Sequence, residues 1–230
     1  MRQALASTND EARSLAQAGA ADGVVVLAEQ QTAGRGRRGA DWFAAAGESL
    51  AFSIIVRPAE PRALWPRLAL ACGLAVAEAA EAWAPDVGIK WPNDVWLGRR
   101  KVAGILVEAG TDFAVVGIGI NVSTRVFPPQ LAALATSLLL ATGQAPERAA
   151  VLTSILRHFD FRRRQLGGGF GEVLAGVRLR CVLSGQAVTL RTAGGLRRGT
   201  IEGLGPGGEL LLRTPAGVER IIQADEVRLA

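Results

Sequence analysis

The chain has 230 residues, of which 49% are hydrophobic and 20% are charged, so it can bury a substantial core. The formal net charge of +5 comes from 26 basic and 21 acidic residues without a long basic run, which argues against a dedicated nucleic-acid-binding protein. The chain lacks the roughly 18 uninterrupted apolar residues of a membrane helix, the apolar core of a secretory signal and clustered cysteines. We therefore expect a cytoplasmic protein without a membrane anchor or a disulfide framework.

The first part of the chain alternates between helix and strand patterns. Residues 7–11, Ser-Thr-Asn-Asp-Glu, predict the start of a helix that ends near residue 19, because a hydroxyl followed by acidic side chains is typical of a helix N-terminus. Apolar runs predict buried strands over residues 24–29 and 50–56, with a polar, glycine-rich loop between them. An alanine- and leucine-rich segment predicts a long helix over residues 62–83.

The middle of the chain predicts more strands and then two helices. The strands are expected over residues 87–91, 101–109 and 113–120, with residues 95–99 forming a turn between the first two. The helices are expected over residues 129–141 and 146–165.

The pattern changes after three glycines at residues 167–169. Short alternating segments separated by glycine-rich turns follow, at residues 187–191, 196–201, 209–213 and 218–222. This spacing predicts a small, barrel-like β module of about fifty residues. We therefore expect two domains, formed by residues 1–176 and 177–230.

Lysine is rare in this chain, since only Lys90 and Lys101 occur among the 26 basic residues. Lys90 begins Lys-Trp-Pro-Asn-Asp, and Lys101 begins Lys-Val-Ala-Gly-Ile-Leu-Val-Glu. Lysine differs from arginine in being a compact, movable point charge whose pKa shifts readily. The two lysines therefore indicate functional positions, unless an arginine bias left them by chance.

Residues 34–39, Gly-Arg-Gly-Arg-Arg-Gly, form the strongest local motif. The glycines let the backbone approach a ligand, and the arginines offer forked donors suited to carboxylate or phosphate. The motif lacks the Gly-Lys-Ser/Thr of a Walker loop and the glycine spacing of a dinucleotide fingerprint. We interpret it as a mobile clamp for an anionic small molecule, with a solvated loop or a nucleic-acid contact as the alternatives. Trp42 follows it, either as a cover for the ligand or as a core residue.

Three further features complete the candidate site. Lys101 is expected at the mouth of its strand, where an amine can hold a carboxylate beside an α-phosphate. Residues 117–121, Gly-Ile-Gly-Ile-Asn, place two glycines on a strand where a ligand can lie flat, although tight packing explains them equally. Asn93 and Asp94 form a turn that could bring a carboxylate to a metal-bound phosphate. The combination suits a hydrophobic carboxylic acid being joined to a nucleotide phosphate.

Five sequence blocks resemble biotin–protein ligases, in the order found in that family. They are residues 7–9, 31–39, 90–94, 101–108 and 117–121. The resemblance covers essentially the whole chain, including the small β module. It implies an α+β fold with a mixed, mainly antiparallel sheet and helices, as in class II aminoacyl-tRNA synthetases and biotin ligases. A small C-terminal SH3-like β-barrel is expected to follow.

The resemblance also implies a two-step reaction. Biotin and ATP, with Mg²⁺, would first give biotinyl-5′-AMP and pyrophosphate. The ε-amine of one lysine on a biotin carboxyl carrier domain of an acyl-CoA carboxylase would then attack the mixed anhydride and release AMP. A monomer or a homodimer would be consistent with the family.

The resemblance assigns roles to individual residues. The residues expected to bind biotin are Ser7, Thr8, Asn9, Gln31, Gly34, Arg35, Gly36, Arg37, Lys101, Gly104, Gly117 and Gly119. The residues expected to bind the nucleotide are Arg37, Arg38, Gly39, Trp42, Lys90, Asn93 and Asn121. The expected catalytic residues are Lys101, Arg35 and Arg37, and the candidate metal ligand is Asp94.

One departure and two alternatives accompany this hypothesis. Some family members carry an N-terminal winged helix-turn-helix and act as repressors, but here the first block starts at Ser7, so we expect no DNA binding. A lipoate–protein ligase is related in fold but lacks the Gly-Arg loop in this form. The second alternative is a non-catalytic regulator or nucleic-acid-binding module that keeps the fold and its basic loop.

Overall fold

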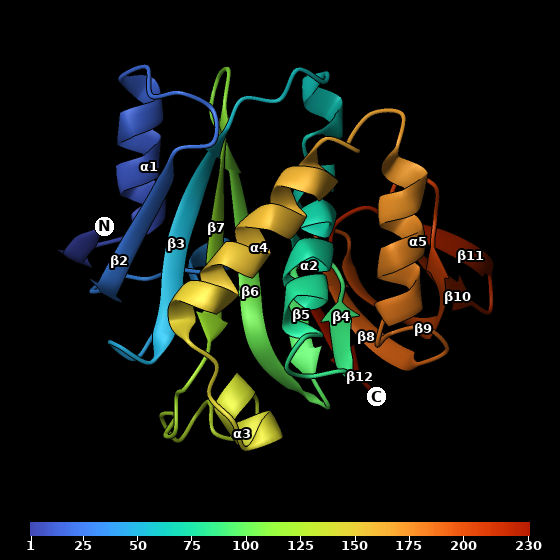
Figure 1. Cartoon of the computed structure of the whole chain (residues 1–230). Helices are drawn as coiled ribbons and strands as arrows, with labels where there is room; N and C mark the ends of the chain where they lie inside the picture. The colour runs from blue at the N-terminus through green and yellow to red at the C-terminus, as the bar shows by residue number, and fades with distance from the viewer.

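The computed structural model describes residues 1–230 and contains two β-sheets and five α-helices (Figure 1). The larger sheet has seven strands in the order β1-β2-β3-β7-β6-β5-β4. Only β1 and β2 are parallel, which confirms the expected mixed, mainly antiparallel sheet. The strands are β1 (Arg2–Leu5), β2 (Val25–Gln31), β3 (Ser49–Val56), β4 (Val87–Lys90), β5 (Asp94–Leu97), β6 (Arg100–Ala109) and β7 (Ala114–Asn121).

Helices cover both faces of this sheet. The α-helices are α1 (Thr8–Gln17), α2 (Arg67–Ala80), α3 (Leu138–Thr142), α4 (Arg148–Arg163) and α5 (Phe170–Arg180). Alternate residues of a strand point to opposite faces, so Ile55 packs in the α1 cluster while Ile54 packs in the α2 cluster. Every residue of β3 and β7 is consequently buried. Helices α4 and α5 flank α2 on its face of the sheet (Figure 1).

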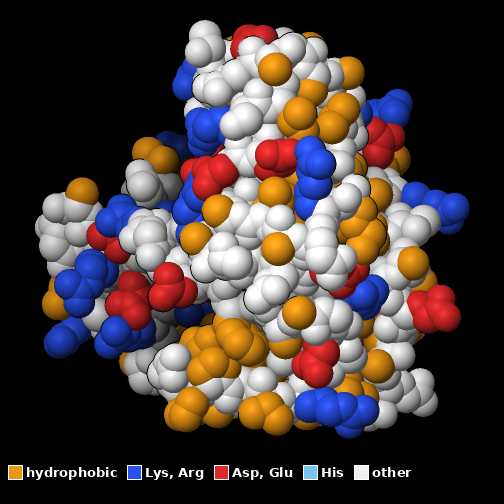
Figure 2. Space-filling view, turned by 90° about the vertical axis from the view of Figure 1, so that its left-hand side faces the viewer, with side chains coloured by type: hydrophobic (Ala, Val, Ile, Leu, Met, Phe, Trp, Pro, Cys, Tyr) orange, Lys and Arg blue, Asp and Glu red, His pale blue; other side chains and the backbone are white.

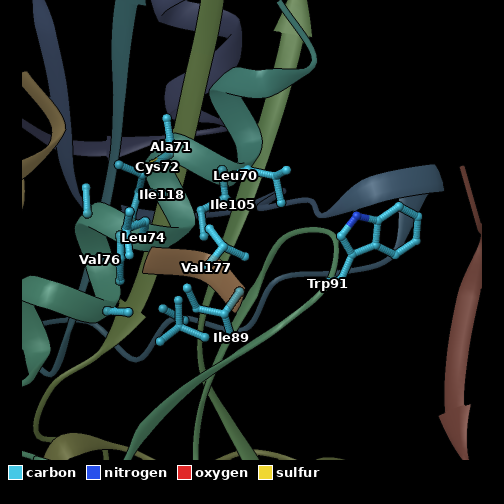
Figure 3. Close-up of a cluster of buried hydrophobic side chains, with 14 of the residues drawn as sticks. Leu70, Ala71, Cys72, Leu74, Val76, Ile89, Trp91, Ile105, Ile118 and Val177 are labelled. Carbon is cyan, nitrogen blue, oxygen red and sulfur yellow. The ribbon is translucent and has the colours of Figure 1, made fainter. Parts of the chain in front are cut away.

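The main core lies between α2 and the sheet. Side chains of α2, such as Leu74, lie beside Ile105 of β6 and Ile118 of β7 (Figure 3). Gly176 allows α5 to approach α2 closely, because a Cβ atom there would lie 2.8 Å from a methyl group of Leu74. This core supports the sheet from behind and leaves part of its opposite face for the site.

The second sheet has five antiparallel strands in the order β11-β10-β9-β8-β12. It fits the expected small C-terminal β module. The sheet does not close into a continuous hydrogen-bonded barrel, because β11 and β12 are its two edges and do not pair with each other. One hydrophobic cluster joins it to the larger sheet, and Trp91 Nε1 donates to the carbonyl oxygen of Gly208 at 2.9 Å. Its strands are β8 (Ala187–Thr192), β9 (Gly195–Leu204), β10 (Leu210–Thr214), β11 (Gly217–Ile221) and β12 (Glu226–Leu229).

The expected domain boundary at residue 177 lies inside α5. The second sheet itself begins only at Ala187. A division into two domains at residue 177 therefore stays a prediction.

Several local predictions were wrong. The helix expected over residues 129–141 is only α3, because the preceding segment forms turns after Pro128 and Pro129 and then pairs with β6 through Lys101. Residues 95–97 lie in β5 rather than in a turn, and only Gly98 and Arg99 turn the chain. The long helix expected from residue 62 is a 3-10 turn over Arg62–Leu64 followed by α2, with proline, which has no N–H to donate, at position 66.

No helix has the length and apolar character needed to cross a membrane.

Candidate functional site

A cavity of about 200 Å³ opens on the α1 face of the larger sheet. It collects side chains from α1, the loop after β2, the turn before β5, and strands β6 and β7. The predicted site residues that line it are Ser7, Thr8, Asn9, Gln31, Arg35, Gly36, Arg37, Trp42, Asn93, Asp94, Lys101, Gly104, Gly117 and Gly119. All five sequence blocks, far apart in the chain, therefore contribute residues to one site.

Glycines form the floor of the cavity. Gly104 of β6 is paired directly with Gly119 of β7, so two positions without side chains lie side by side. The indole of Trp42 covers this floor, because a Cβ atom at Gly119 would overlap the ring and one at Gly104 would lie 3.2 Å from it. A Cβ atom at Gly117 would overlap the carboxamide of Asn9. Glycine is therefore required in the floor, because only a residue without a side chain lets Trp42 and Asn9 pack this closely on the strands.

Trp42, like Trp96 and Asp225, has a buried polar atom without a hydrogen-bond partner. Its Nε1 is buried and has no hydrogen-bond partner within the chain. A buried indole N–H usually finds an acceptor, so this donor is available to a ligand. The ring lies over Gly104 and Gly119, and its expected role in nucleotide binding stays a prediction.

A polar cluster closes the end of the cavity at α1. Gln31 Oε1 accepts from the backbone N–H of Thr8 at 2.7 Å and from its hydroxyl at 3.0 Å. Ser53 Oγ lies 2.8 Å from Thr8 Oγ1 and 2.6 Å from Asn9 Oδ1, and Asn9 Nδ2 donates to Glu108 at 2.7 Å. These bonds fix the side chains of Thr8 and Asn9 before a ligand binds.

Arg35 is held by carboxylates of the larger sheet and α1. Its two terminal nitrogens donate to Asp10 at 2.7 and 2.6 Å, and one also donates to Glu108 at 3.2 Å. The hydrogen bonds from Arg35 hold the pKa of Asp10 below its usual value, and the same pair raises the pKa of Arg35. Arg35 is thus a fixed cation at the cavity wall.

The next two arginines of the loop reach the second sheet. Arg37 donates to Asn93 Oδ1 at 3.3 Å and to the carbonyl oxygen of Ala224 at 3.0 Å. Burial lowers the pKa of Arg37, which marks a guanidinium withdrawn from water. Arg38 forms an ion pair with Asp225.

Lys101 lines the cavity beside Gly104. Its Nζ is 2.6 Å from Asp94 Oδ1 and 5.5 Å from the centre of the Trp42 ring. A bulge between β5 and β6 places Asp94 opposite Gly104 and Trp96 opposite Lys101, so that Asp94 and Lys101 come together. No group of three or more His, Cys, Asp or Glu side chains could hold a metal ion.

The structure does not bring all predicted residues to the cavity wall. Lys90 lies over the ring of Trp96 at 4.7 Å, and burial lowers its pKa. Asn121 is buried and donates to the carbonyl oxygen of Thr136 at 3.1 Å. The predicted residues outside the lining are Gly34, Arg38, Gly39, Lys90 and Asn121. Gly34 still packs against the cavity, since a Cβ atom there would lie 3.0 Å from the Gln31 amide nitrogen.

Sequence reasoning missed several lining residues. They are Ala40, Asp41, Ile105, Leu106, Ile118 and Asp225. Ser53 and Glu108 were also missed as the partners that fix Asn9. A serine in the otherwise apolar run of β3 was an available signal, whereas nothing near Asp225 in the sequence indicated a link to the loop.

The chain matches known proteins in both sequence and structure. Residues 2–123 match the biotin/lipoate A/B protein ligase family. The bifunctional ligase/repressor BirA of Bacillus spizizenii is 36% identical over 230 residues, covering 96% of this chain and 71% of the relative. The biotin–[acetyl-CoA-carboxylase] ligase of Paracoccus denitrificans is 35% identical over 233 residues, covering 96% of each chain.

A solved structure matches over the whole chain. The biotin protein ligase from Aquifex aeolicus in complex with biotin and ATP aligns with a TM-score of 0.91 at 31% identity, covering 100% of this chain and 98% of that one. The two-sheet fold is thus that of the biotin protein ligases. The chain belongs to the biotin/lipoate A/B protein ligase family.

Proposed function

We propose that the protein is an ATP-dependent biotin–protein ligase. It activates biotin as biotinyl-5′-AMP with release of pyrophosphate, and it then transfers the biotinyl group to a lysine of a biotin carboxyl carrier domain. The observation that carries this proposal is the cavity itself, in which Lys101 and Arg37 lie beside a floor of Gly104 and Gly119. The names of the two relatives and of the aligned structure support biotin as the acid.

The cavity suits a ligand with a polar ring and an acidic tail. Thr8, Asn9 and Gln31 present hydroxyl and amide groups at one end, which match the ureido oxygen and N–H groups of biotin. The Trp42 indole lies directly on Gly119, so the apolar part of the ligand would lie on the glycine floor once the ring moves aside. The carboxylate would then point toward Lys101.

The first step joins the acid to the nucleotide. A carboxylate oxygen of biotin attacks the α-phosphorus of ATP, the bond to the bridging oxygen of the β-phosphate breaks, and pyrophosphate leaves. Negative charge grows around the α-phosphate, where Lys101 and Arg37 provide fixed positive charge. Mg²⁺ would screen the phosphate charge when bound. Asp94 is the candidate residue that would hold Mg²⁺, as a carboxylate in the cavity wall.

The second step transfers the acyl group. The neutral amine of the carrier lysine attacks the acyl carbon, the bond to the phosphate oxygen of AMP breaks, AMP leaves, and the proton passes to water. No side chain of this protein becomes covalently modified. Loop residues 34–39 would exclude water from the mixed anhydride until the carrier arrives.

The nucleic-acid alternative finds less support. The cavity cations Arg35 and Lys101 and the loop residue Arg38 already pair with carboxylates, and acidic and basic side chains are interspersed on the face in Figure 2. We therefore do not extend the repressor half of the Bacillus name to this chain. Absence of DNA binding, a monomeric or homodimeric state and a cytoplasmic location stay predictions.

Acid-dependent pyrophosphate release tests the proposal. The purified chain is incubated with Mg-ATP and with biotin, with lipoate or without acid. Release with biotin alone is expected. Release with lipoate alone would identify the lipoate branch of the family, and no release from folded protein would contradict acid activation.

A further inference from the structure

The Gly-Arg loop is attached to two different parts of the molecule. Arg35 holds it to Asp10 and Glu108, which belong to α1 and β6. Arg37 and Arg38 hold it to Ala224 and Asp225, in the segment between β11 and β12 of the second sheet. The loop therefore bridges the larger sheet and the second sheet.

The anchor in the second sheet is held by a backbone hydrogen bond and by the burial of its neighbour. The backbone N–H of Asp225 donates to the carbonyl oxygen of Arg191 in β8 at 2.7 Å, and Ala224 is 1% exposed. Asp225 lies between β11 and β12 and is the one residue from this part of the chain that lines the cavity. Its side chain thus connects that sheet directly to the site.

The conformation of Arg38 depends on this anchor. Arg38 is the one non-glycine residue with a positive φ, at 58°, and Gly39 follows with a φ of 75°. A left-handed backbone is unfavourable for arginine, so surrounding contacts must hold it. Asp225 is the carboxylate that the Arg38 guanidinium meets, and its Oδ1 is buried and has no hydrogen-bond partner, so the ion pair with Arg38 is the contact that can do so.

We propose that Asp225 is a positioning residue that latches the loop closed through Arg38. The proposal rests on the proposed function, in which the loop retains the acyl-adenylate. Asp225 touches neither the acid nor the phosphate in this account and acts only on loop opening. Loss of the latch increases opening of residues 34–42 and speeds escape of the adenylate, while adenylate formation continues.

An ordinary surface ion pair is the competing explanation. Such pairs contribute little when exposed, and 47% of the Arg38 side chain is exposed. The two explanations differ in what they predict for the loop. An ordinary pair leaves loop opening unchanged, whereas a latch changes it locally.

Hydrogen exchange in the unliganded full chain distinguishes the latch from an ordinary ion pair, and the measurement does not depend on enzymatic activity. Amides of the loop are held by bonds from Gly36 N to Ala40 O and from Trp42 N to Gly34 O, at 2.6 and 3.0 Å. We expect Asp225→Asn to raise exchange of residues 34–42 by about two- to fivefold, and Asp225→Glu to retain protection. The control is Glu202→Gln, which removes the partner of Arg213 elsewhere in the second sheet.

A double-mutant cycle completes the exchange test. If the two side chains act as one latch, Arg38→Gln combined with Asp225→Asn exchanges no faster than Asp225→Asn alone. Unchanged exchange in Asp225→Asn, or the same increase in Glu202→Gln, overturns the latch.

Adenylate retention tests its consequence. Enzyme loaded with labelled biotin and Mg-ATP is chased with unlabelled biotin, and the label lost from the protein is followed. We expect loss to be about two- to fivefold faster in Asp225→Asn, with a similar rate of pyrophosphate formation in the first turnover. If the wild-type chain forms no adenylate, the proposed function is contradicted but the latch is not, because the hydrogen-exchange test does not depend on adenylate formation. Equal retention in both proteins contradicts the latch.

Discussion

Lys101 and Asp94 face each other in the cavity wall, with 2.6 Å between the lysine Nζ and Oδ1 of the aspartate. The bulge between β5 and β6 creates this pair, which keeps the amine in place while the cavity lacks an anionic ligand. A carboxylate and a phosphate entering the cavity would compete with Asp94 for the same ammonium group. The pair thus holds the Lys101 amine at the position where the carboxylate of the acid would meet the α-phosphate of the nucleotide.

Replacement of Lys101 tests this relationship. Lys101→Ala removes the point charge at the junction, so we expect biotin-dependent pyrophosphate release to fall by about 10²- to 10³-fold with the fold retained. Arg99→Ala, on the exposed turn before β6, is the control and should leave the rate unchanged. A near-normal rate in Lys101→Ala would remove Lys101 from its proposed role.

Substitution in the glycine floor should weaken ligand binding. A methyl group at Gly119 would overlap the Trp42 indole, so Gly119→Ala displaces either the ring or the ligand, and we expect biotin affinity to fall by at least roughly tenfold. At Gly73 in α2 a Cβ atom meets nothing within 4 Å, so Gly73→Ala should keep affinity and add up to about 1 kcal/mol of stability. Isothermal titration calorimetry measures both variants, and wild-type affinity in Gly119→Ala would argue against the floor.

The hydrogen bond from Trp91 to Gly208 should stabilise the contact between the two sheets. Trp91→Phe leaves the buried carbonyl of Gly208 without its donor, so the free energy of unfolding should fall by about 1 to 3 kcal/mol. Trp83→Phe, at a partly buried tryptophan whose indole makes no hydrogen bond within the chain, should cost less. Urea denaturation compares the two variants, and equal losses would contradict a specific role for the bond.

The Asp10–Arg35 pair should contribute to acid sensitivity. The pKa of Asp10 is lower in the folded chain than its ordinary value of 3.8, because Arg35 stabilises the ionised form. A depressed folded pKa gives stability that is fully present above pH 3.8 and is lost as the pH falls through the folded pKa. The stability difference between wild type and Asp10→Asn should therefore shrink below that pH. Urea unfolding measured across a pH series checks this, and a difference that grows on acidification would contradict it.

Local motifs predicted most of the site. The glycines of β7, the Gly-Arg loop and Lys101 could be recognised because each sits in a short segment whose chemistry is unusual for its element. The strands β2, β3 and β7 were also predicted from their apolar runs, and β3 and β7 are covered on both faces, whereas β2 alternates between buried and half-buried residues.

Tertiary contacts explain what could not be predicted. Helix α5 contains Gly171 and Gly176, which disfavour an isolated helix, yet its packing on α2 stabilises it. The contact of Arg38 with Asp225 joins residues far apart in the chain, and no periodicity or spacing reports it. The roles of Ser53 and Glu108 likewise follow only once β3, β6 and α1 are assembled around Asn9.

Modification of a carrier domain is the most direct test of the proposed biotin–protein ligase activity. The chain is incubated with Mg-ATP, biotin and a purified biotin carboxyl carrier domain, and intact-mass spectrometry follows the carrier and a version whose acceptor lysine is replaced by arginine. We expect one biotinyl group on the intact carrier and none on the substituted one or with Lys101→Ala. An unmodified carrier, in the presence of folded protein and both substrates, would contradict the proposed activity.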